Sequence, residues 1–144
     1  MKTFKIFTVG KSNGLTLKQQ MEWRLKLSQE IENRNERKCI IHFVHPPYYF
    51  DNNYTDLREM LNWEINQISD SNIMVVDLSA ISDCTKTLIE LSAAQTINNT
   101  SNKHIYIVGF GNSNTIHPWF DSFIFHKCEN IIETAEYITT YLLI

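Results

Sequence analysis

Residues Ile73–Ala94 read IMVVDLSAISDCTKTLIELSAA, and this stretch decides the fold. Its first residues form an apolar, β-branched run that is typical of a strand buried on both faces. A polar loop, Asp77–Thr85, follows this run, and the apolar residues after the loop have helical spacing. The helix carries Glu90 on the side that should face the sheet. A buried carboxylate costs free energy unless it is paired, so the stretch also indicates a candidate site.

Strands and helices alternate on both sides of this stretch. The predicted strands are Phe4–Gly10, Cys39–Val44, Ile73–Leu78, His104–Phe110 and Ser122–His126. The predicted helices run from the N-cap Thr16 to Asn33, from about Thr55 to Ser69, from about Thr85 to Asn98, and over Ile131–Leu142. This alternation predicts a parallel sheet between two helix layers. We therefore expect one α/β domain, residues 1–144, a flavodoxin-like or Rossmann-like three-layer sandwich with five parallel strands in the order 2-1-3-4-5.

Composition and charge exclude several classes of function. The net charge is −3 and the sequence has no basic cluster, which argues against a nucleic-acid partner. We expect no membrane partner, because the first residues lack the pattern of a signal peptide and no apolar run approaches ~18 residues. The three cysteines lack the CxxC spacing of a zinc site. They indicate free thiols in a cytoplasmic protein, and we expect neither a metal nor a cofactor.

Each of the first three predicted helices places one ionisable residue within its apolar face. These residues are Arg24, Glu64 and Glu90. Any one of them could be a structural ion pair or lie at the edge of the stripe, but three together favour a functional cluster. In this fold ligands bind beyond the carboxyl ends of the strands, close to the expected place of Glu90. The macrodipole of its helix should favour the anionic form that a nucleophile needs.

Three other patterns have simpler explanations. Gly10-Lys11-Ser12 looks like the end of a phosphate loop, but a Walker motif would need a glycine where this chain has Lys5. His42 and His45 have a metal-like spacing, yet on a strand they point to opposite faces, so we expect a core or hydrogen-bonded histidine. Cys84 has no histidine near it in sequence, and we interpret it as a bystander.

Several short motifs follow one another in a recognisable order. They are Thr8-Val9-Gly10, Trp23-Arg24, Glu64 ahead of the third strand, Asp77-Leu78-Ser79 at its end, and the TLIELSAA segment Thr87–Ala94. Together they resemble the nucleoside 2-deoxyribosyltransferase family and its N-glycosidase relatives. The resemblance covers most of the chain. It implies the same α/β fold, a small-molecule nucleoside or nucleotide ligand and a homo-oligomer, dimer or higher.

The resemblance also implies a reaction, the cleavage or transfer of the N-glycosidic bond of a (deoxy)nucleoside or nucleoside monophosphate. Glu90 would attack the anomeric carbon in a retaining mechanism, and Glu64 would orient the nucleophile or the sugar hydroxyls. Asp77 and Asp83 are both candidates for the acid that protonates the base. The candidate substrate-binding residues are Val9, Gly10, Lys11, Ser12, Arg24, Tyr48, Ser79 and Trp119.

The chain departs from the family pattern in the loop before Glu90. Ser82-Asp83-Cys84-Thr85 stands where the family has Ser-Gly-Thr, and Ser92 replaces a glycine. Two alternatives therefore stay open. A TIR-like domain that processes NAD also places a glutamate after a middle strand, although Leu88-Ile89 stands here where Trp-Cys is usual. A non-catalytic nucleotide sensor of the same fold is the other alternative.

Overall fold

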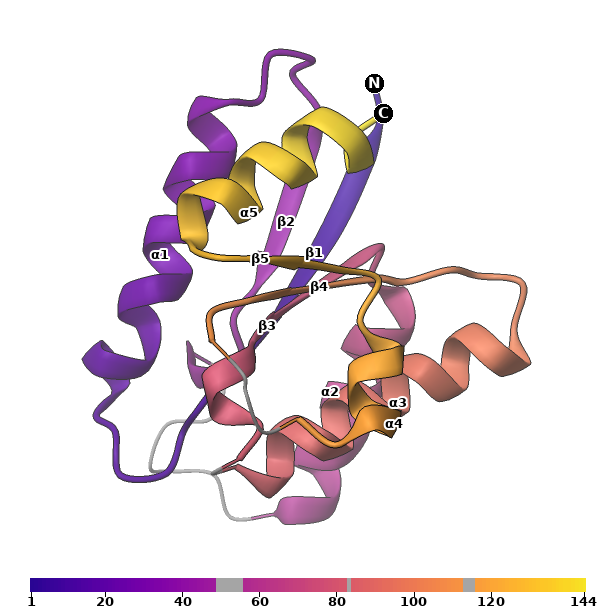
Figure 1. Cartoon of the computed structure of the whole chain (residues 1–144). Helices are drawn as coiled ribbons and strands as arrows, with labels where there is room; N and C mark the ends of the chain where they lie inside the picture. The colour runs from indigo at the N-terminus through magenta and orange to yellow at the C-terminus, as the bar shows by residue number, and fades with distance from the viewer. Residues whose placement is uncertain (49–55, 83, 113–115) are drawn as a thin grey trace.

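A parallel five-stranded sheet lies between two layers of helices (Figure 1). The computed structural model describes residues 1–48, 56–82, 84–112 and 116–144. The strands are β1 (Thr3–Val9), β2 (Ile40–Val44), β3 (Ile73–Asp77), β4 (Tyr106–Phe110) and β5 (His126–Cys128). They pair in the order β2-β1-β3-β4-β5, all parallel, which confirms the predicted fold class and strand order.

The helices divide between the two faces of the sheet (Figure 1). One face is covered by α1 (Leu17–Asn33) and α5 (Ile131–Tyr137), and a π-helical turn, Ile138–Leu142, continues α5. The other face is covered by α2 (Leu57–Asp70), α3 (Thr85–Thr100) and α4 (Pro118–Phe123). Each face therefore has its own hydrophobic core.

The central strand β3 contributes to both cores because its side chains alternate. Ile73 and Val75 pack with residues of α1 and α5, whereas Met74 and Val76 pack with residues of α2 and α3. All four side chains are buried. The sheet order reverses between β1 and β3, which is where ligands bind in folds of this kind.

The helix α1 begins where the sequence predicts. The Thr16 hydroxyl accepts a hydrogen bond from the backbone N–H of Gln19 at 3.2 Å, and the Gln19 side chain accepts one from the Thr16 N–H at 2.9 Å. This reciprocal capping box satisfies two N–H groups that have no partner inside the helix. It fixes the entry of α1 and so the position of the residues that α1 contributes to the site.

Two predicted elements are wrong in detail. The segment Ser122–His126 is not a strand, because Pro118–Phe123 forms α4 and β5 begins only at His126. Phe120 and Phe123, three residues apart, both pack on the core beneath α2 and α3, as helical spacing allows. β2 is only partly buried, contrary to the expectation of a strand covered on both faces, because it lies at the edge of the sheet.

Candidate active site

A cavity of about 400 Å³ lies beyond the carboxyl ends of β1 and β2, beside the first turns of α3. Its polar lining residues are Gly10, Ser12, Gln20, Arg24, Glu64, Lys86 and Glu90, and its apolar ones are Pro46, Pro47, Leu57, Met60, Leu61 and Ile89. The polar residues come from the loop after β1 and from α1, α2 and α3. The cavity wall thus combines charged and apolar residues.

Three charged side chains that the sequence predicts to face inward are buried at this cavity. Arg24 is 3% exposed, Glu64 5% and Glu90 4%. They belong to three different helices, so the packing of α1, α2 and α3 around the sheet is what brings them together. Helical periodicity therefore predicted their direction correctly.

Burial raises the pKa of Glu90 well above its usual range, and the neighbouring carboxylate of Glu64 raises it further. Lys86 and Arg24 act in the opposite direction but do not cancel the effect of burial. Burial therefore acts against the expected effect of the helix macrodipole on Glu90. Glu90 is the sixth residue of α3, and the macrodipole acts mainly within the first turn.

Glu64 forms an ion pair with Lys86, whose Nζ lies 2.8 Å from the Glu64 Oε1 atom. Lys86 precedes Glu90 by four residues on α3, so the two side chains share a face of that helix. Its ammonium group pairs with one carboxylate and lowers the pKa of the other. Lys86 therefore couples Glu64 on α2 to Glu90 on α3.

The guanidinium group of Arg24 is held from several sides. Its Nε donates to the Thr8 hydroxyl at 3.0 Å, and its Nη1 donates to the Gln20 carbonyl at 2.6 Å. Its Cζ lies 4.7 Å from the centre of the Trp23 ring, within cation–π range. Burial lowers the pKa of Arg24 to about 10, while Glu90 and Asp77 oppose this shift. The group therefore stays cationic at neutral pH.

The loop after β1 lies directly against Trp23. A Cβ atom at Gly10 would sit only 2.9 Å from the Cζ2 atom of Trp23, so a larger residue there would force the Trp23 side chain or the loop to shift. The Trp23 ring also packs against the ring of Phe110, and the two ring centroids lie 5.0 Å apart. This close contact brings the next residues of the loop, including Ser12, to the wall of the cavity.

His45 lies behind Arg24, at the end of β2. Its Nδ1 lies 2.8 Å from the Thr8 hydroxyl and its Nε2 lies 2.9 Å from the Ser28 hydroxyl. Burial and the charge of Arg24 lower the pKa of His45 to about 4, so the ring is neutral at physiological pH. His42, on β2, is exposed, whereas His45 follows the last residue of that strand. The prediction of a hydrogen-bonded core histidine is confirmed for His45.

Cys84 caps α3 just outside the cavity. Burial raises the pKa of its thiol, but hydrogen bonds from Thr87 and Ser12 outweigh burial, and the net pKa is lowered. The Ser12 Oγ lies 4.0 Å from the Cys84 Sγ. The thiol does not line the cavity, so its contact with Ser12 connects the loop after β1 to the start of α3.

Of the predicted site residues, five line the cavity: Gly10, Ser12, Arg24, Glu64 and Glu90. Others lie elsewhere. Val9 is buried in the core, and the half-buried Lys11 is absent from the cavity wall. Tyr48 is 55% exposed and faces a separate concavity along the outer side of α1. The catalytic candidate Asp83 lies outside the described residues.

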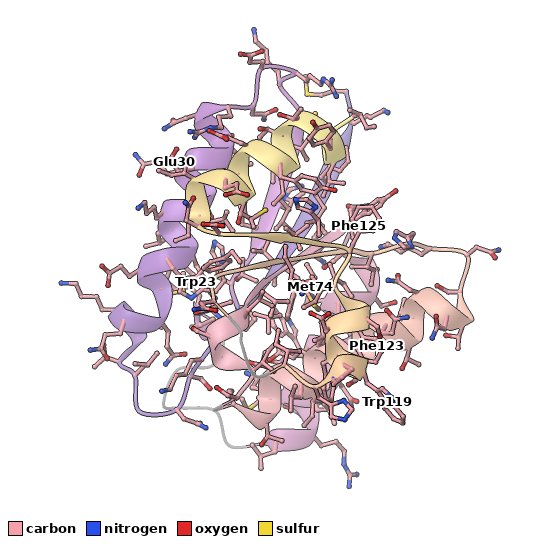
Figure 2. The ribbon with its side chains drawn as sticks, in the orientation of Figure 1. Trp23, Glu30, Met74, Trp119, Phe123 and Phe125 are labelled. Atoms are coloured by element: carbon pink, nitrogen blue, oxygen red, sulfur yellow. The ribbon has the colours of Figure 1, made fainter. Side chains whose placement is uncertain are left out.

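Asp77 and Ser79 have a local structural role. The Asp77 Oδ1 atom accepts hydrogen bonds from the backbone N–H of Ser79 at 3.1 Å and from its hydroxyl at 2.7 Å. These bonds cap the 3-10 turn Leu78–Ala80 that follows β3. Trp119, the second residue of α4, is 74% exposed, and Figure 2 shows it far from Trp23 on α1. The catalytic role of Asp77 and the substrate-binding roles of Ser79 and Trp119 stay predictions.

Sequence reasoning missed part of the cavity wall. The residues that line the cavity but were not predicted to do so are Gln20, Pro46, Pro47, Leu57, Met60, Leu61, Lys86 and Ile89. Lys86 had a visible signal, since a lysine four residues before an inward-facing glutamate on a helix shares its face. The prolines had none, because their place depends on how β2 ends beside β1.

The described ranges contain no group of three or more His, Cys, Asp or Glu side chains placed to hold a metal ion. Across the same four ranges, no helix is long and apolar enough to cross a membrane.

No model of a known protein family matches this sequence, and no curated protein matches it. Solved structures do match. A conserved protein from Enterococcus faecalis V583 aligns over 97% of this chain and 99% of its own, with a TM-score of 0.71 and 12% identity. The CMP N-glycosidase BcmB of Clostridium botulinum aligns over 96% of this chain and 99% of its own, with a TM-score of 0.58 and 12% identity. This chain therefore shares the fold of both proteins over almost its whole length.

Proposed function

We propose that this protein cleaves or transfers the N-glycosidic bond of a (deoxy)nucleoside or a nucleoside monophosphate. The observation that carries the proposal is the pair of buried carboxylates, Glu64 and Glu90, on two helices that line one cavity beyond the strand ends. Most enzymes that hydrolyse glycosidic bonds use a pair of carboxylates in one site. The shared fold with a CMP N-glycosidase supports this choice.

Glu90 is the proposed nucleophile. Its ionised carboxylate attacks the anomeric carbon while the bond from that carbon to the nucleobase breaks, and an acid, for which Asp77 and Asp83 are the candidates, donates the proton to the departing base. Water or a second base then attacks the glycosyl ester, and the Glu90 carboxylate is released. Water gives hydrolysis and a second base gives transfer. The nearby cations Arg24 and Lys86 stabilise the ionised form of Glu90.

Glu64 is the proposed partner of the nucleophile. Its carboxylate pairs with Lys86, and it raises the pKa of Glu90. In this place it can accept a hydrogen bond from a sugar hydroxyl or hold Glu90 in position. The apolar residues of the cavity wall, which include Pro46, Pro47 and Ile89, offer a surface on which a flat nucleobase can lie.

The proposal is tested by incubating the protein with purine and pyrimidine nucleosides, their 5′-monophosphates and NAD, with and without an acceptor base. Liquid chromatography then measures the free base. We expect wild type to release base and Glu90→Gln to lose at least about a hundredfold in rate while it keeps its fold. Glu59→Gln is the matched control, because Glu59 is an exposed carboxylate on α2.

Other outcomes identify the alternatives. Binding without turnover across the whole panel would contradict the enzyme and favour a nucleotide sensor. Cleavage of NAD, but of none of the nucleosides or monophosphates, would favour a TIR-like domain. A fully active Glu90→Gln protein would show that another residue is the nucleophile.

A further inference from the structure

A chain of hydrogen bonds runs behind Arg24, and the direction of each bond can be assigned. The Ser28 hydroxyl donates its one proton to the Arg24 carbonyl at 2.9 Å. In its contact with His45 Nε2, at 2.9 Å, the Ser28 oxygen must therefore be the acceptor. It follows that His45 carries its proton on Nε2 and that Nδ1 is an acceptor.

The other half of the chain follows from this tautomer. The Thr8 hydroxyl donates to the His45 Nδ1 at 2.8 Å, since its alternative acceptor, the Val44 carbonyl, is farther away at 3.3 Å. The Thr8 oxygen then accepts the hydrogen bond from Arg24 Nε at 3.0 Å. The chain thus starts at the Arg24 side chain and returns to the Arg24 backbone.

Burial makes these bonds matter. Thr8 is fully buried and Arg24 and His45 nearly so, and a buried donor that loses its partner costs about 1–3 kcal/mol. The Nε and one side of Nη1 are occupied by Thr8 and by the Gln20 carbonyl. In the part of the chain that the structure describes, no group accepts a hydrogen bond from Nη2. Arg24 lines the cavity, so Nη2 is available to a ligand.

We propose that Thr8, His45 and Ser28 are positioning residues, which hold the Arg24 guanidinium at the cavity wall so that Nη2 binds an oxygen atom of the substrate. The proposal rests on the proposed function, because it takes a nucleoside or nucleotide as the ligand. The three residues come from β1, the end of β2 and α1. Arg24 therefore loses little conformational freedom when the ligand binds, since the fold has already fixed its orientation.

The test removes the hydroxyl group of Thr8 at nearly constant volume. Thr8→Val deprives Arg24 Nε of its acceptor, whereas Thr8→Ser keeps the hydroxyl. Calorimetry in a Glu90→Gln background measures binding of cytidine, adenosine and their 5′-monophosphates without turnover. We expect Thr8→Val to weaken binding of the best ligand about tenfold or more, and Thr8→Ser to stay within about threefold. In the active protein the same change should raise KM much more than it lowers kcat.

His45 provides an independent pair of variants. His45→Asn keeps an acceptor near the position of Nδ1, whereas His45→Leu removes it. The asparagine variant should therefore bind the best ligand more tightly than the leucine variant does. Thr134→Val controls for the loss of a buried hydroxyl elsewhere, because Thr134 on α5 is fully buried and donates to the Asn130 carbonyl at 2.8 Å. We expect this control to lower stability without changing affinity. The ¹⁵N shifts of His45 should also report the Nε2–H tautomer.

Three results would overturn the proposal. Thr8→Val and His45→Leu could bind as tightly as wild type while folded, or Thr8→Ser could be as weak as Thr8→Val, which would indicate packing alone. Failure to bind any of the four ligands would overturn it as well. If wild type shows no turnover but Thr8→Val still weakens ligand binding, only the proposed function is contradicted. Failure of the positioning proposal and failure of the proposed function are therefore distinguishable.

Discussion

Glu90 holds its proton more tightly than an ordinary glutamate, because burial and Glu64 raise its pKa. A nucleophile must be ionised, so the rate of base release should fall as the pH drops through this raised pKa and recover as the pH rises. The acid limb of kcat/KM should therefore lie above the usual range of a glutamate. If Glu90 were instead the proton donor, its titration would produce a loss of activity with rising pH.

Two variants move this limb in opposite directions. Glu64→Gln removes a negative neighbour and releases Lys86, so the limb should shift to lower pH. Lys86→Met removes a positive neighbour, so it should shift to higher pH. The measurement is the pH dependence of kcat/KM for wild type and both variants. If the acid limb lies at the same pH in wild type and in both variants, the group that titrates is not Glu90.

At the scale of single residues, the sequence predicted directions better than partners. The helical period alone places Arg24, Glu64 and Glu90 inward, and all three are buried. The ion pair between Lys86 and Glu64 could not be predicted in this way, because it joins two helices. Their relative rotation and height are set by packing on the sheet, about which neither helix carries local information.

At the scale of elements, the loop after β1 packs closely on α1, and Gly10 leaves little room for a Cβ atom beside Trp23. Gly10→Ala would place a Cβ atom 2.9 Å from the Trp23 ring, which cannot move freely because it also packs on Phe110. We expect a loss of about 1–3 kcal/mol in the free energy of unfolding. Urea denaturation of the variant and wild type measures it.

The same substitution in a Trp23→Leu background is the matched test of the cause. A smaller side chain leaves room for the new methyl group, so most of the cost of Gly10→Ala should disappear there. An equal cost in both backgrounds would show that the backbone at Gly10, rather than the ring of Trp23, sets the penalty.

Element prediction failed where local patterns competed. The aromatic alternation of Ser122–His126 indicates a strand, yet Pro118 starts a helix and the His117 side chain caps it by accepting a hydrogen bond from the Trp119 N–H at 3.1 Å. Helical spacing then packs the partly buried Phe120 and Phe123 against the same core. The register of β5 follows from its pairing with β4, which the local sequence does not encode.

At the scale of the whole molecule, the charged residues of the cavity bear on the choice between a nucleoside and its 5′-monophosphate. Arg24 and Lys86 are the cations among the residues that line the cavity, and both act on the Glu90 carboxylate. A phosphate group would have to compete for them with Glu64, which pairs with Lys86, and with the ionised form of Glu90.

We accordingly expect a nucleoside to be cleaved with about tenfold higher kcat/KM than its own 5′-monophosphate. Parallel rate measurements on cytidine and CMP, and on adenosine and AMP, test this ratio. Glu64→Gln should narrow this ratio, because it removes the Glu64 carboxylate that competes with a phosphate for Lys86. A preference for both monophosphates would contradict the charge argument and identify a phosphate site elsewhere on the cavity wall.

The overall architecture was the most predictable level. Alternation of strand and helix patterns, together with the handedness of crossovers, leaves few possible topologies, and the order β2-β1-β3-β4-β5 is the one expected. The cavity was less predictable. Its position follows from the order reversal between β1 and β3, whereas its apolar lining depends on how Pro46 and Ile89 approach each other from distant parts of the chain.

The charged groups of the cavity all stand on helices: Arg24 on α1, Glu64 on α2, and Lys86 and Glu90 on α3. Loop residues that do not contact Arg24 or its hydrogen-bonded neighbours can therefore be exchanged with little displacement of these charges. An engineer who wished to alter ligand choice could graft new sequence beyond Ser12 or beyond His45 and keep the four side chains as a constant frame. The same separation would let substrate preference diverge quickly in evolution while the chemistry changes slowly.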